Sequence, residues 1–234
     1  MEGRKVAIVT AGGRGMGAAI ARALAERDHA LVLMSPGGSA EALAEELGAI
    51  GVNGSVTRAG DLEAAVAAAM DAHGRVDAVA NNAGFPPKGE LLDIPDEDWR
   101  DGLDMVLLNV IRMARLVTPI MVAQGGGAIV NISTYAAVEP SPAYPVSATF
   151  RAGLSAFTKL YADRYAADGV RMNNILPGFI DTHGADDKVA EGIPARRYGT
   201  PEEVGETAAF LLSDGAGYIT GQNLRIDGGL TRSV

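Results

Sequence analysis

Short apolar runs alternate with segments of helical spacing along the whole chain. Seven of these runs have the length and the β-branched content of buried strands. They lie at residues 5–11, 30–35, 51–58, 76–84, 128–133, 170–178 and 222–229. Strands that alternate with helices need crossover connections, which produce a parallel sheet covered by helices on both faces. The pattern therefore predicts an α/β fold with a doubly wound parallel sheet of about seven strands, in a single domain over residues 1–234.

Two of the predicted helices are long, and each carries one apolar stripe. The stripe within residues 96–123 consists of Trp99, Leu103, Val106, Val110, Ala114 and Val117. The stripe within residues 145–168 consists of Leu154, Phe157, Tyr161 and Tyr165. No apolar run is expected to be both long enough and sufficiently free of charge to span a bilayer. The long irregular stretch at residues 181–197 contains Gly, Asp and Pro and is predicted to be a mobile substrate lid.

Composition narrows the function classes. The chain of 234 residues has no Cys, which excludes disulfides, cysteine-bound zinc and thiolate catalysis. Its three His are scattered, and its formal net charge of −9 disfavours binding to nucleic acid. The N-terminus lacks the apolar segment of a secretory signal. These features predict a cytoplasmic protein whose partner is a small molecule, with no metal, nucleic acid or membrane.

The segment TAGGRGMGAAIA, residues 10–21, connects the first strand to the first helix. In this context a glycine-rich turn holds a pyrophosphate, because bare backbone N–H groups and the helix N-terminus attract an anion. Gly15 and Gly17 allow close approach of the backbone and close helix–sheet packing. The turn therefore predicts dinucleotide binding.

With these residues the chain resembles the short-chain dehydrogenase/reductase family along its whole length. The turn is similar to the family pattern T-G-x-x-x-G-x-G, with Ala11 in place of the first glycine, and the adjacent Gly12 and Gly13 are expected to supply the freedom of the turn. The family's N-N-A-G is intact at residues 81–84, Asp61 matches its adenine-side acidic residue, and residues 219–229 resemble its C-terminal strand.

The resemblance implies a Rossmann-type domain that binds a nicotinamide dinucleotide. Pro177 and Gly178, with Thr182 four residues later, match the segment that contacts the carboxamide side of the nicotinamide. The implied cofactor-binding residues are Thr10, Gly13, Arg14, Gly15, Met16, Gly17, Ser35, Asp61, Leu62, Asn82, Ala83, Gly84, Arg151, Pro177, Gly178, Ile180 and Thr182.

Nucleotide preference depends on the end of the second strand. An acidic residue there would bind the ribose diol and repel a 2′-phosphate. That position falls at Ser35 or Pro36, and neither is charged. Residues 35–39 offer hydroxyl and backbone donors to a phosphate, and Arg14 adds a positive charge. NADP(H) is therefore favoured over NAD(H).

The segment AYPVSATFRAGL, residues 143–154, departs from the family where the chemistry is carried. The resemblance places Asn109 and Thr134 at the family's Asn and Ser positions, but it places Ser147 at the Tyr position and Arg151 at the Lys position. Arg151 can hydrogen-bond a ribose hydroxyl, but Arg stays protonated and cannot relay a proton. An aliphatic hydroxyl cannot be tuned like a phenol beside a cation. Cofactor binding is therefore expected to survive the exchange, while the usual proton relay is lost.

Tyr144 offers a replacement proton donor. The spacing of Tyr144 and Arg151, with six residues between them, resembles that of the Tyr and Lys in enoyl reductases of the same superfamily. Pro145 is a favourable first helical residue, so Tyr144 is expected at the helix entry, one turn before Ser147. The other interpretation makes Tyr144 a packing residue beside the cofactor pocket, and Tyr135 is a weaker candidate for the donor.

The substrate is expected between the ends of the fourth and fifth strands and the lid. Apolar or aromatic residues in these segments are Phe85, Pro86, Pro87, Tyr135, Phe179 and Ile193. Candidate anion contacts are Lys88, His183, Arg196 and Arg197. A solvated loop is the more typical setting for a His such as His183.

Three functions remain open. The first is an NAD(P)-dependent oxidoreductase that reduces a carbonyl group or an activated C=C bond of a ketone or an enoyl thioester, with a non-standard proton donor. The second is a catalytically impaired dinucleotide-binding protein that acts as a sensor or partner subunit. The third is lyase or isomerase chemistry in the same pocket. The resemblance also implies a homodimer or homotetramer in which the two long helices pack across a two-fold axis.

Overall fold

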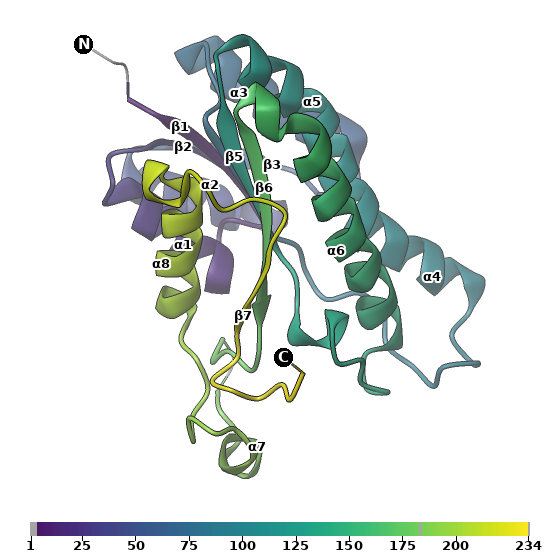
Figure 1. The fold of residues 1–234 in the computed structure, drawn as a ribbon. Coiled ribbons are helices and arrows are strands. Elements are labelled where there is room, and N and C mark those ends of the chain that lie inside the picture. Colours follow the sequence, from purple (N-terminus) through teal and green to yellow (C-terminus); the bar gives the residue numbers. More distant parts are fainter. Residues whose placement is uncertain (1–3, 183, 234) are drawn as a thin grey trace.

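The computed structural model describes residues 4–182 and 184–233 (Figure 1). Within these residues one parallel sheet of seven strands forms the centre of the molecule. The strands are β1 (Val6–Thr10), β2 (Ala30–Ser35), β3 (Ile50–Asn53), β4 (Ala78–Asn81), β5 (Gly127–Ile132), β6 (Val170–Pro177) and β7 (Asn223–Ile226). Their spatial order is β3-β2-β1-β4-β5-β6-β7. The predicted doubly wound sheet is therefore confirmed, and the order reverses between β1 and β4, where open α/β sheets bind their ligands.

The helices lie in two layers, one on each face of the sheet (Figure 1). Helices α1, α2 and α8 cover one face, and α3, α5 and α6 cover the other. The described helices are α1 (Gly15–Ala25), α2 (Ser39–Leu47), α3 (Ala59–His73), α4 (Asp96–Leu103), α5 (Asn109–Ala123), α6 (Pro145–Tyr165), α7 (Asp187–Gly192) and α8 (Pro201–Leu212). Because both faces are covered, β1, β2 and β4 are buried along their whole length and read as continuous apolar runs.

The two long helical segments appear as predicted, with one irregularity. Residues 145–168 form α6 followed by a single 3-10 turn at Ala166–Asp168. The other segment runs from α4 to α5, but its middle part, Asp104–Leu108, is π-helical. A π-helical turn inside an α-helix accommodates one extra residue and is frequent at functional sites. This turn ends directly before Asn109.

The helical segment Asp96–Ala123 corrects one expectation from the sequence. It has 28 residues, and a window with a mean hydropathy of 1.7 makes it long and apolar enough to cross a membrane by length and composition. In the fold, its residues Val110, Met113 and Val117 are buried against the sheet. This part of the segment therefore belongs to the core.

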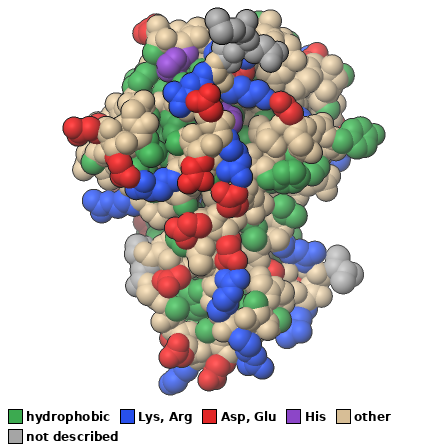
Figure 2. Space-filling model, turned by 90° about the vertical axis from the view of Figure 1, so that its left-hand side faces the viewer, with side chains coloured by type: hydrophobic (Ala, Val, Ile, Leu, Met, Phe, Trp, Pro, Cys, Tyr) green, Lys and Arg blue, Asp and Glu red, His purple; other side chains and the backbone are tan. Residues whose placement is uncertain are grey.

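The face formed by α1 and α8 has no region of a single charge sign. Acidic and basic side chains lie interspersed on it (Figure 2), and several of them pair. Arg22 pairs with Glu46 at 2.5 Å, and Arg27 pairs with Glu206 at 2.6 Å. Exposed pairs of this kind contribute little to stability, so this face is a solvated surface.

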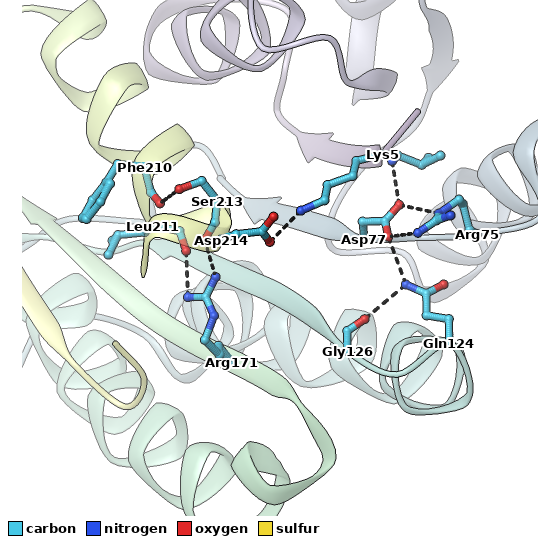
Figure 3. A network of polar contacts seen from close by, with 11 residues as sticks. Lys5, Arg75, Asp77, Gln124, Gly126, Arg171, Phe210, Leu211, Ser213 and Asp214 are labelled. Atoms are coloured by element: carbon cyan, nitrogen blue, oxygen red, sulfur yellow. Dashed lines mark hydrogen bonds and ion pairs between the residues drawn. The ribbon is translucent and has the colours of Figure 1, made fainter. Parts of the chain in front are cut away.

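A polar network closes the amino end of the sheet, opposite the predicted site (Figure 3). The Asp77 carboxylate accepts hydrogen bonds from the Val6 backbone N–H at 2.8 Å and from the Arg75 guanidinium at 2.6 Å. Lys5 pairs with Asp214 at 2.6 Å. The network links the start of β1 to the start of β4 and to the turn after α8, and thereby fixes the frame that carries the site.

Candidate active site

The glycine-rich turn after β1 is tied to the end of β4. The Thr10 hydroxyl donates to the Asn82 carbonyl oxygen at 2.7 Å and accepts from the Asn82 backbone N–H at 2.9 Å. The Asn82 side-chain amide donates to the Ala11 carbonyl oxygen at 3.3 Å. These bonds bring two predicted cofactor residues together at the reversal point of the sheet. Their polar groups are used within the protein, so both residues position the turn.

Ala11 itself adopts the left-handed conformation that the turn requires, with φ of +44°. The expectation that Gly12 and Gly13 supply this freedom is wrong, because neither has a positive φ. A left-handed residue with a Cβ costs roughly 1 kcal/mol, so the turn is strained here. Gly17 is needed for a different reason, since a Cβ at this position would lie 2.1 Å from the Ala11 carbonyl oxygen.

Helix α1 begins beside this turn with uncapped N–H groups. Arg14, the residue before the helix, makes no side-chain capping bond, and the first turn holds no acidic residue. Gly15 has φ of +51°, and a Cβ on it would lie 3.4 Å from the methyl group of Thr182. An uncapped helix start attracts a phosphate. The turn and the segment after β6 therefore meet where a pyrophosphate would lie, and these residues fit a dinucleotide.

A groove of about 440 Å³ opens between α1 and the turn after β2. It is lined by Gly13, Arg14, Arg22, Gly37, Gly38, Ser39, Ala42, Leu43 and Glu46. Ser35 is buried beside it, and its hydroxyl bonds the Ser39 hydroxyl at 2.9 Å. Gly13 packs so closely that a Cβ on it would lie 2.4 Å from Ser39 Oγ. The sequence reasoning missed Arg22, because this cation lies two turns into α1.

Other predicted cofactor residues have structural partners. The Asp61 carboxylate accepts from the Ser55 backbone N–H at 2.7 Å and from Arg58 Nε at 2.7 Å, and these bonds hold the pKa of Asp61 below its ordinary value. The Leu62 side chain is buried in the core, and Met16 packs against the core from its edge. Leu62 therefore offers a ligand only its backbone.

Arg151 lies inside the protein on α6 and has no carboxylate partner among the residues that the structure describes. Its Nη1 donates to the Ile132 carbonyl oxygen at 2.5 Å, and its Nε donates to Ser147 Oγ at 3.2 Å. Burial lowers the pKa of the guanidinium to about 10. A buried cation without an acidic partner is costly unless a ligand completes its hydrogen bonds. Arg151 therefore fits the ribose-binding position.

Asn109 follows the π-helical turn and lines a small cavity beside Arg151. The cavity measures about 10 Å³, which suits one water molecule. Ala83 lines the same cavity, next to the exposed Gly84. Asn109 Nδ2 donates to the Met105 carbonyl oxygen at 2.7 Å, and its buried Oδ1 has no partner among residues 4–182 and 184–233. This acceptor is the kind of group that holds an ordered water.

Thr134 and Tyr144 each directly precede a helical element that follows β5. Thr134 precedes a 3-10 turn, and Tyr144 precedes α6. Thr134 Oγ1 accepts from the Ala136 backbone N–H at 3.4 Å and caps the 3-10 turn Tyr135–Ala137. Tyr144 is the residue before α6, and its carbonyl oxygen accepts from the Ala148 N–H at 2.8 Å. The structure thus places Tyr144 at the helix entry, which is its predicted position.

Aromatic rings continue from this helix entry towards the segment after β6. The rings of Tyr135 and Phe179 lie 5.8 Å apart, and those of Phe179 and Tyr198 lie 5.5 Å apart. Burial, followed by the neighbouring Tyr144 phenol, raises the pKa of Tyr135 above its ordinary value. A raised pKa makes Tyr135 the weaker acid and the poorer proton donor.

The segment after β6 is held by the last strand and by a short bridge. The Gly178 N–H donates to the Ile226 carbonyl oxygen at 2.9 Å, and Ile180 pairs with Gly199 in an isolated bridge. A Cβ on Gly178 would lie 2.8 Å from Asp227 Cα, so the backbones touch. Pro177, the last residue of β6, is buried beside this contact. These contacts position the residues that follow, so that Thr182 lies beside the glycine turn.

The predicted lid at residues 181–197 contains the short helix α7, at the carboxyl end of the strands (Figure 1). Arg197 pairs with Glu203 at 2.6 Å, and Arg196 donates to the Glu191 carbonyl oxygen at 2.5 Å. Both cations are thus engaged within the chain. His183 lies outside the described residues.

A row of four asparagines, three of them buried, crosses the sheet, and the sequence reasoning missed it. Asn81 Nδ2 donates to Asn131 Oδ1 at 2.9 Å, Asn131 Nδ2 donates to Asn174 Oδ1 at 2.9 Å, and Asn174 Nδ2 donates to Asn223 Oδ1 at 2.8 Å. The Thr158 hydroxyl of α6 also donates to Asn174 Oδ1. These residues stand at paired positions of neighbouring strands. The asparagine row therefore fixes the register of four strands below the site.

The fold and this site together define a dinucleotide-binding oxidoreductase. The family described as enoyl-(acyl carrier protein) reductase matches residues 10–231. The 3-oxoacyl-[acyl-carrier-protein] reductase of Synechocystis sp. is 36% identical over 97% of this chain and 96% of its own. Oxidoreductase UcpA of Salmonella typhimurium is 35% identical over 97% and 94%.

Two solved structures have the same fold over nearly the whole chain. The L-sorbose reductase from Gluconobacter frateurii, complexed with NADPH and L-sorbose, superposes with a TM-score of 0.92 at 29% identity and covers 99% of this chain and 98% of its own. YwfH, an NADPH-dependent reductase involved in bacilysin biosynthesis, gives 0.94 at 25% identity, with 99% and 100% covered. The chain belongs to the short-chain dehydrogenase/reductase family, and its cofactor is a nicotinamide dinucleotide.

Proposed function

We propose that this protein is an NADP(H)-dependent reductase of a carbonyl group or an activated C=C bond, with Tyr144 as its proton donor. The observation that carries the proposal is the arrangement on α6. Arg151 keeps a buried positive charge with no carboxylate partner in the described part of the chain, and Tyr144 stands seven residues earlier at the entry of the same helix. Arg151 thereby binds the cofactor and Tyr144 transfers the proton. Seven positions separate these two residues, whereas four separate the Tyr and Lys that are usual in the family.

Each residue has one task in this reaction. A bound reduced nicotinamide supplies a hydride to the substrate. Arg151 donates hydrogen bonds to ribose hydroxyls, and the Thr134 hydroxyl donates to the substrate oxygen as negative charge develops there. The Tyr144 phenol delivers the proton. Asn109 holds a water beside Arg151 and keeps the buried cation solvated.

The preference for NADP(H) rests on the groove beside the glycine turn. A 2′-phosphate would enter a site with no acidic residue at Ser35 and with the cations of Arg14 and Arg22 on its walls. Arg22 is paired with Glu46, so it contributes after that pair opens. The NADPH complex of the L-sorbose reductase and the NADPH dependence of YwfH support the same preference.

The remaining proposals concern the substrate lid, the oligomeric state and the localisation of the protein. Residues 181–197 act as a lid over the substrate, since they begin where Thr182 meets the glycine turn. The partly exposed faces of α5 and α6 pack against a second copy, which gives a homodimer or homotetramer. The protein works in the cytoplasm on a small-molecule substrate.

The test is the oxidation of NADPH by a panel of ketones and enoyl thioesters, followed at the nicotinamide absorbance band. We expect at least one panel member to be reduced by the wild-type protein. Tyr144→Phe should lower kcat by about a hundredfold or more, because general acid catalysis contributes at least that much. Ser147→Ala is the matched control and should leave kcat close to the wild-type value. Turnover that survives Tyr144→Phe would contradict the assignment of the donor.

A second candidate is a catalytically impaired nucleotide-binding protein that acts as a sensor or partner subunit. It is favoured by the bond between Arg151 and Ser147, since neither residue of this pair can deliver a proton as a phenol does. NADPH binding without oxidation by any panel member would support this candidate over the first.

A further inference from the structure

Lys88 is a cation at the substrate end of the site. It lies in the loop after β4, four residues beyond Gly84. Its Nζ stands 4.8 Å from the centroid of the Tyr144 ring and 5.9 Å from that of the Phe85 ring. No ion pair of Lys88 exists within residues 4–182 and 184–233, whereas Lys5 pairs with Asp214.

Cation–π contacts with the rings of Phe85 and Tyr144 hold the Lys88 ammonium in position. A Lys ammonium over an aromatic face is held by the quadrupole of the ring, while its N–H groups stay free to donate. The Phe85 side chain is 74% exposed, so a ligand can reach the Lys88 ammonium from that side. The ammonium group of Lys88 therefore lies over the ring of Tyr144, the proposed proton donor.

We propose that Lys88 binds a carboxylate of the substrate, so that the substrate is a small carbonyl acid with an apolar or aromatic remainder. This inference rests on the proposed function, because it takes Tyr144 as the donor. The carboxylate bonds the ammonium, and the neighbouring carbonyl oxygen lies within reach of the Tyr144 phenol. The aromatic row from Tyr135 to Tyr198 contacts the rest of the molecule.

The reaction balances without a further reagent. The carbonyl carbon gains a hydride, and with it two electrons, from the bound reduced nucleotide. The C=O π bond breaks, and the oxygen gains one proton through Tyr144. A 2-oxo acid thus becomes a 2-hydroxy acid, and NADPH becomes NADP⁺.

The experiment compares acids with their neutral esters. Pyruvate, benzoylformate and 4-phenyl-2-oxobutanoate are assayed beside their methyl esters, with wild-type protein, Lys88→Met and Lys88→Arg. We expect the wild type to prefer the acids. Lys88→Met should lower kcat/KM for the acids by about 10-fold to 100-fold, mainly through KM, as expected for a hydrogen bond to a charged group. The esters should be unaffected, and Lys88→Arg should retain most of the preference.

A binding measurement keeps the inference independent of turnover. Mandelate and the neutral mandelamide are titrated into the complex with NADP⁺ by calorimetry. Mandelate should bind more tightly to the wild type, and Lys88→Met should remove the difference. Lys159→Met is the control, because Lys159 pairs with Asp163 elsewhere on α6.

The outcomes separate the two proposals. If no reduced nucleotide binds, the proposed function fails. If NADPH binds but mandelate shows no advantage over mandelamide, or if Lys88→Met weakens acids and esters by the same factor, only the inference about Lys88 is overturned. Reduction of neutral ketones or thioesters in preference to the acids would overturn it as well.

Discussion

Replacing Arg151 by Met tests the role of the buried charge most sharply. The Met side chain is of similar length and flexible, so it fills the space without the charge. Burial lowers the pKa of the guanidinium from 12.5 to about 10. One pKa unit corresponds to about 1.4 kcal/mol, so keeping the charge inside costs the folded protein about 3 kcal/mol. The folded-state pKa lies below the unfolded value, so this cost is present in full below about pH 10 and is relieved as the pH rises towards 12.5.

The hydrogen bonds of Arg151 offset this cost. The bonds to Ile132 and Ser147 together contribute about 3 to 5 kcal/mol, and the Met variant loses them. The two terms nearly cancel. We therefore expect the free energy of unfolding of the unliganded variant to lie within about 2 kcal/mol of the wild type. For a chain of this length, that is a change in Tm of less than about 8 °C.

The assay is thermal unfolding at neutral pH with and without NADPH. A ligand at about 100 times its Kd adds about 2.7 kcal/mol, which raises the Tm of the wild type by roughly 5 to 10 °C. Arg151→Met should lose most of this rise. The control is Arg171→Met at the opposite end of the sheet, where Arg171 bonds the carbonyl oxygens of Leu211 and Ser213. That variant should be less stable but keep the NADPH effect. An Arg151→Met protein that keeps the full rise, or that fails to fold, would refute the reasoning.

Three further substitutions test the turn, the asparagine row and the nucleotide preference. Ala11→Gly should raise the free energy of unfolding by about 0.5 to 1 kcal/mol in urea denaturation, because the left-handed strain is relieved, whereas Ala49→Gly at an ordinary φ should lower it. A loss of stability in Ala11→Gly would contradict this. Asn131→Leu should cost about 1 to 3 kcal/mol, since the buried Asn81 amide N–H loses its acceptor while Asn174 Oδ1 keeps only its bond from Thr158, and an unchanged urea midpoint would argue against a stabilising row. Ser35→Asp should raise the KM ratio of NADPH to NADH by about tenfold or more, and an unchanged ratio would rule out the assigned 2′-phosphate position.

The fold could be predicted from the sequence because the central strands β1, β2 and β4 are short, buried, mainly apolar runs that helices cover on both faces. The π-helical turn at Asp104–Leu108 could not, since the apolar stripe continues through it without a break. The one local hint is Asn109, a polar residue in an apolar segment, which the structure places directly after the irregular turn. Periodicity records which face of a helix is buried, but it does not record a single inserted residue.

The site was predicted less completely, because several of its features depend on residues far apart in the chain. Each buried Asn looks isolated in its own strand, and only the register of the sheet brings Asn81, Asn131 and Asn174 into one row. The available signal was the recurrence of Asn in apolar strands, at Asn81, Asn131 and the pair Asn173–Asn174. The position of Lys88 over the ring of Tyr144 likewise could not be predicted, because the two residues lie far apart in the chain. The left-handed residue of the glycine turn was wrongly expected at Gly12 or Gly13, whereas Ala11 adopts this conformation. Composition alone does not show which residue of a turn is left-handed.

A single-turnover experiment with bound NADPH tests directly whether Tyr144 delivers the proton, because fluorescence reports both nucleotide binding and its oxidation by a reducible substrate. We expect wild-type protein and Tyr144→Phe to bind NADPH with the same affinity, and oxidation in the variant to be slower by about two orders of magnitude or more. Equal oxidation rates in the two proteins, or a nucleotide emission with wild-type protein that equals that of free NADPH, would contradict this assignment.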